Sequence, residues 1–177
     1  MNCYILTGGR STRMRQSKTE LFLDRVVAAA SPVFDEVVAV QRAGDEILQI
    51  RTIHERPHAD EGPVFAVARA LEDAQAPAVI LAVDYPSMTA EFLRDLVTRF
   101  EAGSASMLVP VWRGIPQPLC AGYRARVLPI IESRLEQRKL DLLGLMKDAA
   151  ADTFVFDGWE LLNVNTPDEL REAERVR

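Results

Sequence analysis

The sequence is poor in cysteine and histidine, with two of each in 177 residues. Cys3 and Cys120 both lie in apolar runs, so we expect two buried thiols rather than a disulfide. His54 and His58 are four residues apart, but Pro57 between them is incompatible with a helical metal-binding pair. A zinc site uses several nitrogen and sulfur ligands and is therefore not expected. We predict a reducing, cytoplasmic environment.

The sequence also lacks long apolar runs and an excess of positive charge. No run approaches the roughly 20 residues that span a bilayer, and the N-terminus has no secretion-signal pattern, so no membrane partner is expected. The net charge of −5 disfavours a general nucleic-acid binder, because such proteins carry positive charge on their binding face. With 48% hydrophobic and 27% charged residues, the chain has the composition of a single globular domain over residues 1–177.

Strand-like and helix-like segments alternate along the chain. Runs that are apolar at consecutive positions predict buried parallel strands at Cys3–Leu6, Val37–Val40, Val79–Val83 and Met107–Val111. Helical patterns lie at Glu20–Ala30, Val64–Ala74, Ala90–Glu101 and Ala125–Leu135. Such alternation is typical of an α/β fold with right-handed crossovers. We predict a three-layer α/β/α, Rossmann-like fold with a mostly parallel sheet.

Local signals add detail to this pattern. Thr89 is a predicted N-cap of the third helix. A fifth helix is predicted after Thr166, with Pro167 in its first turn and Glu169 as the acid of a capping box. The segment WRGIPQPLCAGYR, residues 112–124, breaks the rhythm and predicts a hairpin or a strand inserted beside the sheet. It either walls a pocket or is an ordinary edge connection.

The loop after the first predicted strand, LTGGRSTRMRQSK over residues 6–18, combines two glycines with four cations: Gly8, Gly9, Arg10, Arg13, Arg15 and Lys18. Open α/β sheets bind ligands at the carboxyl ends of their strands. Glycines there allow close backbone approach and expose N–H groups to phosphate, and the cations would neutralise a polyphosphate. The spacing matches neither a Walker loop nor a dinucleotide fingerprint. A solvated basic turn is the alternative.

Asp84 follows the apolar run AVILAV and should end a buried strand. A carboxylate in that position can hold Mg²⁺ against phosphate oxygens; otherwise it closes the strand or caps a turn. Asn163 and Asn165 flank a valine, so in extended backbone both point to one face. Their amides could donate to phosphate or accept from a ribose hydroxyl, or serve turn chemistry before Pro167.

Four segments together resemble one family. The loop at residues 6–18 is similar to that of nucleotidyltransferases that build sugar nucleotides and cofactor dinucleotides, and in particular to the molybdenum cofactor guanylyltransferase (MobA) family. ERPHADEGPV at 55–64, LAVDYPSM at 81–88 and LLNVNTPDEL at 161–170 resemble later motifs of that family, in the same order. The resemblance covers essentially the whole chain and implies the fold of the nucleotide-diphospho-sugar transferases.

The resemblance implies an activity with its substrates. It implies transfer of GMP from GTP to molybdopterin, with Mg²⁺ as cofactor, giving the guanine dinucleotide form and pyrophosphate. Candidate protein partners are molybdoenzymes or molybdopterin-insertion proteins. The Gly-Gly pair favours guanine. Three alternatives stay open: a cytidylyltransferase on the same cofactor, a sugar-phosphate nucleotidyltransferase, and a nucleotide- or pterin-binding homologue with impaired catalysis.

Residue roles follow from the same motifs. The resemblance implies catalytic roles for Arg13, Lys18 and Asp84, and a metal site at Asp84 and Asn165, with Asn163 as a further wall of the site. The implied nucleotide-binding residues are Leu6, Thr7, Gly8, Gly9, Lys18, Glu55, Gly62 and Asp84. A solvated side chain is the alternative for Glu55. Gly62 and Pro63 would open the helix facing the nucleotide, Gln41 and Arg42 align loosely with a base contact, and the pterin would lie near residues 112–123, Arg138 and Lys139.

The sequence departs from the family at several positions of the loop. Thr7 replaces an alanine, Arg15 a glycine, and Ser17 the acid before the lysine. A residue in place of a glycine is strained if the backbone there needs a positive φ. The segment between Lys18 and Asp35 is also shorter than is typical. These departures bear on nucleotide affinity and activity rather than on the fold.

Overall fold

The computed structural model describes residues 1–8, 18–45, 48–55, 61–166, 169 and 171. The strands are β1 (Asn2–Leu6), β2 (Val37–Gln41), β3 (Thr52–His54), β4 (Ala78–Ala82), β5 (Met107–Trp112), β6 (Ile115–Pro116), β7 (Cys120–Tyr123) and β8 (Asp152–Val155). The α-helices are α1 (Lys18–Ala30), α2 (Val64–Ala74), α3 (Ala90–Ala102), α4 (Leu128–Glu136) and α5 (Leu142–Asp148). Two 3₁₀ turns, η2 (Ala125–Val127) and η3 (Trp159–Leu161), complete the described elements.

The strands form one mixed, mostly parallel sheet in the order β3-β2-β1-β4-β7-β5-β6, with β8 paired to β5. β1 pairs in parallel with β2 and β4, β2 with β3, and β5 with β8. β7 lies antiparallel between β4 and β5. Leu6 pairs with Val40 on one side and Ala82 on the other. The strands β1, β2 and β4 therefore end together at one edge of the sheet.

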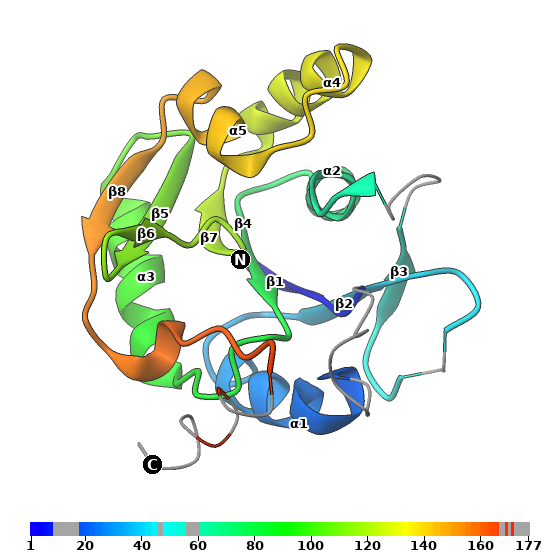
Figure 1. Cartoon of the computed structure of the whole chain (residues 1–177), viewed down its shortest axis with the longest axis vertical. Coiled ribbons are helices and arrows are strands. Elements are labelled where there is room, and N and C mark those ends of the chain that lie inside the picture. The colour runs from blue at the N-terminus through cyan, green and yellow to red at the C-terminus, as the bar shows by residue number, and fades with distance from the viewer. Residues whose placement is uncertain (9–17, 46–47, 56–60, 167–168, 170, 172–177) are drawn as a thin grey trace.

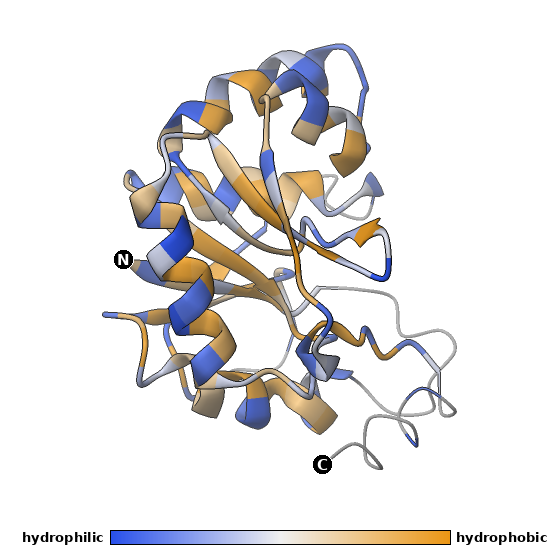
Figure 2. Cartoon of the chain, turned by 90° about the vertical axis from the view of Figure 1, so that its left-hand side faces the viewer, coloured by the Kyte–Doolittle hydropathy of each residue, from blue (hydrophilic) through white to orange (hydrophobic). Residues whose placement is uncertain are grey.

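Helices cover both faces of this sheet, as Figure 1 shows. Cys3 and Ile5 of β1 face a core shared with α1 and α3, whereas Tyr4 and Leu6 face a core shared with α2, α4 and α5. Figure 2 shows largely hydrophobic strands between helices in which hydrophilic and hydrophobic residues alternate. The predicted three-layer α/β/α fold is confirmed. Cys3 and Cys120 are buried free thiols, also as predicted.

The four predicted strands and the first three predicted helices are present within two residues of their expected bounds. The fourth helix differs, because its first three residues form the 3₁₀ turn η2. The predicted hairpin is confirmed as the end of β5 with β6, and Arg113 and Gly114 turn it with φ of +49° and +78°, as two-residue hairpin turns require. β7 is a strand inserted between β4 and β5. β3, β8 and α5 were not predicted: they span only three, four and seven residues.

The predicted helix caps are present. The Thr89 hydroxyl accepts a hydrogen bond from the Phe92 N–H at 3.2 Å. Thr166 and Glu169 form the reciprocal capping box: the Glu169 carboxylate accepts from the Thr166 N–H at 2.8 Å, and the Thr166 hydroxyl accepts from the Glu169 N–H at 3.3 Å. Pro167 lies outside the described residues.

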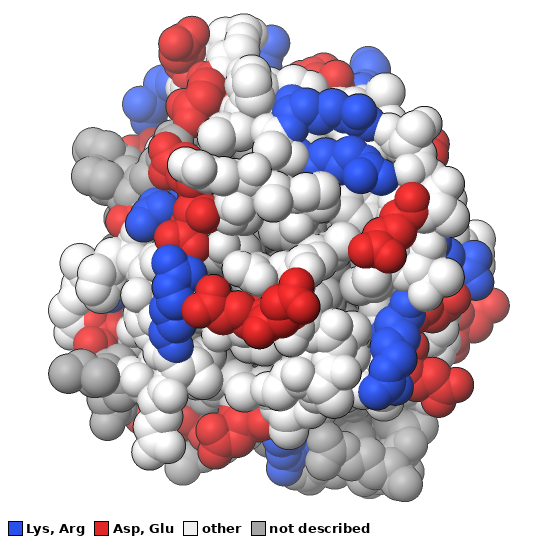
Figure 3. Space-filling model, turned by 180° about the vertical axis from the view of Figure 1, so that it is seen from behind, with Lys and Arg blue, Asp and Glu red and all other residues white. Residues whose placement is uncertain are grey.

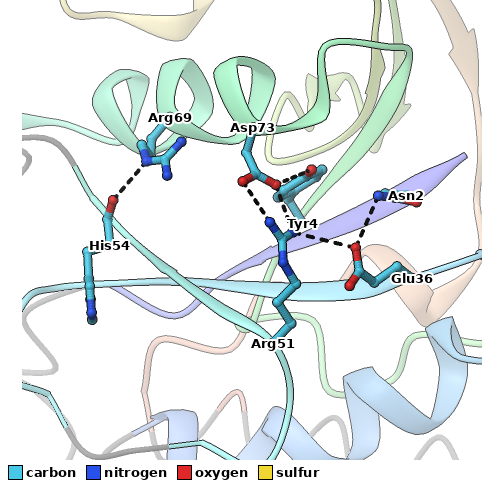
Figure 4. Close-up of polar contacts among 7 residues, drawn as sticks. All are labelled: Asn2, Tyr4, Glu36, Arg51, His54, Arg69 and Asp73. Carbon is cyan, nitrogen blue, oxygen red and sulfur yellow. Dashed lines mark hydrogen bonds and ion pairs between the residues drawn. The ribbon is translucent and has the colours of Figure 1, made fainter.

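A polar network joins α2 to the amino ends of β2 and β3 (Figure 4). The Arg51 guanidinium donates to both carboxylate oxygens of Asp73 at 2.8 and 2.9 Å, and the Tyr4 hydroxyl donates to the same carboxylate at 2.8 Å. Arg51 also pairs with Glu36 at 3.5 Å. The hydrogen bonds from Arg51 lower the pKa of Asp73, and burial raises that of Tyr4 to about 12. This network fixes α2 at the end of the sheet opposite Leu6.

Charges of both signs are interspersed on the face turned away from the viewer of Figure 1, which Figure 3 shows. Among the surface charges of the described residues, whichever face they lie on, Arg99 pairs with Asp95 on α3 at 2.8 Å and Arg138 with Glu61 at 2.8 Å. Within the described ranges no helix has the length and apolar character of a membrane span.

Candidate active site

Two segments leave the sheet side by side at the ends of β1 and β4. The Val83 N–H donates to the Leu6 carbonyl at 3.1 Å, which carries the β1–β4 pairing one step beyond the strands. Thr7 and Gly8 therefore begin the glycine loop next to the position where Asp84 follows β4. Open α/β sheets bind their ligands at this edge.

Lys18, the first residue of α1, joins three segments of the chain at this edge. Its ammonium lies 3.0 Å from the Asp84 carboxylate and donates a 2.7 Å hydrogen bond to the Asn165 side-chain oxygen. Only 14% of the Lys18 side chain and 24% of the Asp84 side chain are exposed. The Val164 N–H donates to the Asp84 carbonyl at 2.9 Å, which holds the Asn165 segment in place. Three predicted site residues thus converge on one point.

The two asparagines face each other as the alternation predicted. The Asn165 side-chain N–H donates to the side-chain oxygen of Asn163 at 2.7 Å. The Glu169 carboxylate accepts a 2.7 Å hydrogen bond from the Asn165 backbone N–H, so the helix cap and the site share one segment. Asn165 therefore takes part in the helix cap and in the site at the same time, so the two interpretations of the asparagines do not exclude each other.

Threonine hydroxyls form hydrogen bonds at both ends of the glycine loop. The backbone N–H and the hydroxyl of Thr7 each donate to the Val40 carbonyl at 3.0 Å. The Thr19 hydroxyl donates to the Thr7 carbonyl at 3.2 Å and so ties the start of α1 to the start of the loop. Thr7, which stands where the family has an alanine, thus uses its hydroxyl in a hydrogen bond. Gly9, Arg10, Arg13 and Arg15 lie outside the described residues.

The Glu55 side chain is largely buried, so the alternative of a solvated glutamate is wrong. Its side chain is 7% exposed, and a Cβ added to Gly8 would lie 2.3 Å from the Glu55 Oε1 atom. The Glu55 Oε2 and Arg42 Nε atoms are 3.8 Å apart, too far for a hydrogen bond, and neither has another hydrogen-bond partner among the described residues. Burial raises the pKa of Glu55, and the Arg42 charge offsets only part of this.

Gln41 and Arg42, which align loosely with a base contact of the family, are held next to Glu55 at the end of β2. The Glu55 N–H donates to the carbonyl of Gln41 at 2.8 Å, which brings Gln41, Arg42 and Glu55 beside Gly8.

The two described ends of the glycine loop therefore have different polar neighbours: the Glu55 carboxylate lies against Gly8, and Asp84 and Asn165 lie at Lys18. A nucleotide along the loop would have phosphate contacts at Lys18 and hydrogen-bonding groups at Glu55.

Gly62 and the hairpin are arranged differently from these groups. Gly62 and Pro63 do precede α2, but a Cβ added to Gly62 would meet Leu140 at 3.7 Å rather than the Lys18 cluster. In the hairpin, the Arg113 guanidinium stacks 4.4 Å from the Trp112 ring centre and 4.8 Å from that of Trp159. Sequence reasoning missed Trp159, because nothing in the sequence indicates that η3 returns to the hairpin.

Sequence reasoning also missed Tyr85 and Gln117. The Tyr85 hydroxyl donates to the Gln117 side-chain oxygen at 2.9 Å. Tyr85 is 1% exposed, and burial raises the pKa of its hydroxyl. The sequence feature that could have pointed to Tyr85 is its position directly after Asp84, a predicted site residue.

The chemistry of this cluster suits a magnesium ion. The Asp84 carboxylate and the Asn165 amide already direct their oxygens at one cation, the Lys18 ammonium. No group of three or more His, Cys, Asp and Glu side chains suited to a metal occurs in the described part of the chain. Mg²⁺ takes one or two protein oxygens, with waters and substrate phosphates completing its shell. Asp84 and Asn165 fit that requirement.

Known proteins resemble this chain over most of its length. The model of the MobA-like NTP transferase domain matches residues 3–150. A protein of Flavobacterium johnsoniae named "Probable molybdenum cofactor guanylyltransferase" is 25% identical over 97% of this chain and 95% of its own length. A protein of the same name from Carboxydothermus hydrogenoformans is 26% identical over 97% of this chain and 94% of its own length.

Solved structures give the same result. The molybdopterin-guanine dinucleotide biosynthesis protein A of Archaeoglobus fulgidus is 25% identical, with a TM-score of 0.84 over 99% of this chain and 98% of that one. The 2-C-methyl-D-erythritol 4-phosphate cytidylyltransferase of Thermus thermophilus, at 14% identity and a TM-score of 0.71 over 98% of this chain and 96% of that one, shares the fold. The chain therefore belongs to the MobA-like NTP transferase family and is a nucleotidyltransferase.

Proposed function

We propose that residues 1–177 act as one domain that transfers GMP from GTP to molybdopterin, forming the guanine dinucleotide cofactor and releasing pyrophosphate. The relatives named as molybdenum cofactor guanylyltransferases cover nearly the whole chain and support this choice of substrates. The observation that carries the proposal is the convergence of Lys18, Asp84 and Asn165 beside a glycine loop at the carboxyl edge of the sheet. The cytoplasmic location stays a prediction.

The reaction suits a site built from charge and position. The terminal phosphate of molybdopterin attacks the α-phosphorus of GTP, a new P–O bond forms, and the bond to pyrophosphate breaks. The attacking phosphate is already an anion, so no strong general base is needed. This agrees with a cluster made of a lysine, a carboxylate and an amide. Catalysis then comes from positioning and from stabilisation of charge on the transferring phosphoryl group.

Each described residue has a role in this scheme. Lys18 neutralises charge on the transferring phosphate and the departing pyrophosphate, and its contact with Asp84 fixes the direction of its ammonium. Asp84 and Asn165 would hold Mg²⁺, which supplies further charge stabilisation at the phosphate when it is bound. Arg13 is proposed as a second phosphate contact.

The nucleoside would lie toward the other end of the loop. Leu6, Thr7, Gly8 and Gly9 offer backbone contacts to the base and ribose. The Glu55 carboxylate oxygen that has no hydrogen-bond partner among the described residues is an acceptor for a ribose hydroxyl or a base N–H. Asn163 acts as a wall of the site and Gly62 as the entry to α2.

Pyrophosphate release from GTP and molybdopterin with Mg²⁺ tests the proposal. Asp84→Asn and Lys18→Ala should each reduce turnover by orders of magnitude, because each removes charge that acts on the reacting phosphates. Their melting temperatures should stay close to that of the wild type. Asp95→Asn on α3 and Lys147→Ala on α5 are matched controls away from the cluster and should keep full turnover. Wild-type turnover in both site variants would remove these residues from the mechanism.

The same assay separates the alternative functions. Release with CTP but not GTP would identify a cytidylyltransferase, and release with a sugar phosphate as acceptor would identify a sugar-nucleotide enzyme. Stabilisation by a nucleotide without any release of pyrophosphate would identify a binding protein with impaired catalysis.

A further inference from the structure

The turn of the β5–β6 hairpin carries an arginine in a strained backbone conformation. Arg113 has a φ of +49°, in the left-handed region that favours glycine, asparagine and aspartate in such turns. The other described non-glycine residues with positive φ are Gln75, Arg138 and Ala150, which follow α2, α4 and α5. Left-handed residues are common just after helices. A long cationic side chain in the hairpin turn therefore points to a function for that side chain.

The Arg113 guanidinium stacks on two tryptophans from different segments. Its central carbon lies 4.4 Å from the ring centre of Trp112, at the end of β5, and 4.8 Å from that of Trp159, at the start of η3. The two ring centres are 6.4 Å apart, and the rings meet at 61°. Cation–π contacts of this kind restrict the position of the charge. These three residues are called the tryptophan–arginine cluster below.

The stacked guanidinium keeps its hydrogen-bond donors for other partners. Arg113 is exposed and the two tryptophans are half-buried. Within the described part of the chain, Arg113 makes no hydrogen bond or ion pair. Arg138, the other described arginine with positive φ, differs because its guanidinium donates to Glu61 at 2.8 Å. The cluster therefore presents a planar set of N–H donors beside two aromatic rings.

Both segments that carry the cluster are hydrogen-bonded to the end of β4. The Tyr85 hydroxyl donates to the Gln117 side-chain oxygen at 2.9 Å, which ties the hairpin to the residue after Asp84. The Val164 N–H donates to the Asp84 carbonyl at 2.9 Å, which ties the segment after η3 to the same strand end. The hairpin and η3 are therefore both anchored next to the carboxylate of the proposed reaction centre.

The order of the strands gives this side of the site to the acceptor. At the carboxyl edge, β2 and β3 lie on one side of β1 and β4, whereas β7, β5 and β6 lie on the other. Glu55 and Gly8, proposed for the nucleoside, belong to the side of β2 and β3. The proposed phosphate contacts at Lys18 and Asp84 lie between the two sides. An acceptor that reaches the α-phosphorus opposite the nucleoside therefore approaches from the hairpin.

We propose that the tryptophan–arginine cluster is the subsite for the pterin ring of the acceptor. The inference rests on the proposed function. A pterin is a flat aromatic ring system, which stacks on tryptophan and on guanidinium planes. One pterin edge carries a carbonyl oxygen beside a ring nitrogen, the same arrangement of acceptors that arginine contacts at O6 and N7 of guanine. The Arg113 donors suit that edge, and Trp112 and Trp159 suit the ring face.

Tryptophan fluorescence observes this cluster alone, because Trp112 and Trp159 are the two tryptophans of the chain. Titration with free pterin, without nucleotide, should quench the emission to saturation, with N-acetyltryptophanamide as the control for light absorption by the pterin. In 2,4-diaminopteridine an amino group replaces the carbonyl oxygen, so this compound should bind about tenfold more weakly. Equal binding of the two compounds, or no saturable quenching by pterin, would overturn the proposal.

Two substitutions of Arg113 test the role of its guanidinium. Arg113→Lys keeps the charge but loses the planar set of donors, and Arg113→Asn places a residue that suits positive φ in the turn. Both should weaken pterin binding by about tenfold. Arg113→Asn should melt within about 3 °C of the wild type, because relief of strain offsets the lost ring contacts. Arg99→Gln, whose guanidinium stacks on Phe154 at 5.0 Å, is the matched control and should bind pterin as the wild type does.

A cluster that only holds η3 against the hairpin gives the opposite results. Arg113→Asn would then melt well below the wild type, while both Arg113 variants bind pterin as tightly as the wild type. This outcome would overturn the proposal. Loss of pterin binding in the presence of GTP and Mg²⁺ would also overturn it, because the pterin would then occupy the position of the nucleotide.

Turnover separates failure of this inference from failure of the proposed function. In the pyrophosphate assay, Arg113→Lys should raise KM for molybdopterin by about tenfold, with kcat and KM for GTP changed by less than about threefold. If the wild type releases no pyrophosphate, the proposed function fails, but binding of free pterin that depends on Arg113 still supports the subsite. An unchanged KM for molybdopterin in both Arg113 variants would overturn the subsite and leave the proposed function standing.

Discussion

Glu55 and Lys18 are both largely buried charges, but their surroundings differ. Lys18 has an anion at 3.0 Å and an amide oxygen at 2.7 Å, so its desolvation is compensated. Within the described ranges the ion pair of Glu55 is with Arg42 at 3.8 Å, and its Oε2 atom has no hydrogen-bond partner there. An uncompensated buried carboxylate lowers stability and is common where a ligand supplies the missing partner. Glu55 is therefore a residue at which we expect a ligand to supply the missing hydrogen-bond partner.

The stability of the protein should therefore depend on the ionisation of Glu55. Burial raises its pKa above the ordinary value near 4.5, Asp45 adds to the rise, and Arg42 opposes it. The folded state thus binds this proton more tightly than the unfolded state, so the contribution of Glu55 to stability falls as pH rises from the unfolded pKa through the folded one. Glu55→Gln should melt above the wild type at neutral pH, and the difference should shrink as the pH approaches the ordinary value.

Thermal melting across this pH range, without nucleotide, measures the effect. Glu20→Gln on the exposed face of α1 is the control, and its difference from the wild type should vary little with pH. If Glu55→Gln melts below the wild type at neutral pH, the attraction between Arg42 and Glu55 outweighs the cost of burial.

At the scale of elements, β7 shows how close packing selects a residue. A Cβ added to Gly122 would lie 2.6 to 2.9 Å from three ring atoms of Phe100, a fully buried side chain of α3. The absent side chain lets α3 approach the antiparallel strand that separates β4 from β5. Gly103, at the end of α3, has only ordinary contacts and a φ of −90°. Close packing against Phe100 therefore requires a glycine at position 122, whereas the contacts at position 103 leave room for a Cβ.

Gly122→Ala should destabilise the protein by about 1–3 kcal/mol, because Phe100 must move within a well-packed core. Chemical denaturation measures the change, and Gly103→Ala is the matched control, with an effect near zero or slightly stabilising. In a Phe100→Leu background the cost of Gly122→Ala should fall, because the two sites are in contact. An equal cost in both backgrounds would show that the ring is not the obstacle.

At the scale of the whole molecule, binding at the carboxyl edge should be visible in the unfolding of the entire chain. A ligand that binds only the folded state at 100 times its Kd adds about 2.7 kcal/mol of stability, roughly 5–10 °C for a chain of this size. GTP with Mg²⁺ should therefore raise the melting temperature more than CTP or UTP at the same concentration. Asp84→Asn should reduce the shift. A larger shift with CTP would change the assignment of the base.

Prediction from sequence succeeded where the signal is local and strong. The strands β1 and β4 contain the buried apolar runs Cys3–Leu6 and Ala78–Ala82. The side chains of Thr89, Thr166 and Glu169 form hydrogen bonds within their own segments, so they mark helix starts locally. Prediction failed for β3, β8 and α5, because short and partly exposed elements depend on the neighbours they pair with. β8 joins the sheet only through β5, some 40 residues earlier in the chain, and no local pattern indicates that pairing.

The sequence by itself determined the fold class, the family and the chemical groups of the site, because hydrophobic periodicity and motif spacing are properties of neighbouring residues. Only the tertiary structure decided which of those groups meet. It placed Asn165 on Lys18, which is 147 residues away in the chain, placed the Glu55 side chain over Gly8, and joined Tyr85 to Gln117, 32 residues further along. Such contacts depend on how crossovers and an inserted hairpin return distant segments to one edge of the sheet, and local sequence carries no record of that geometry.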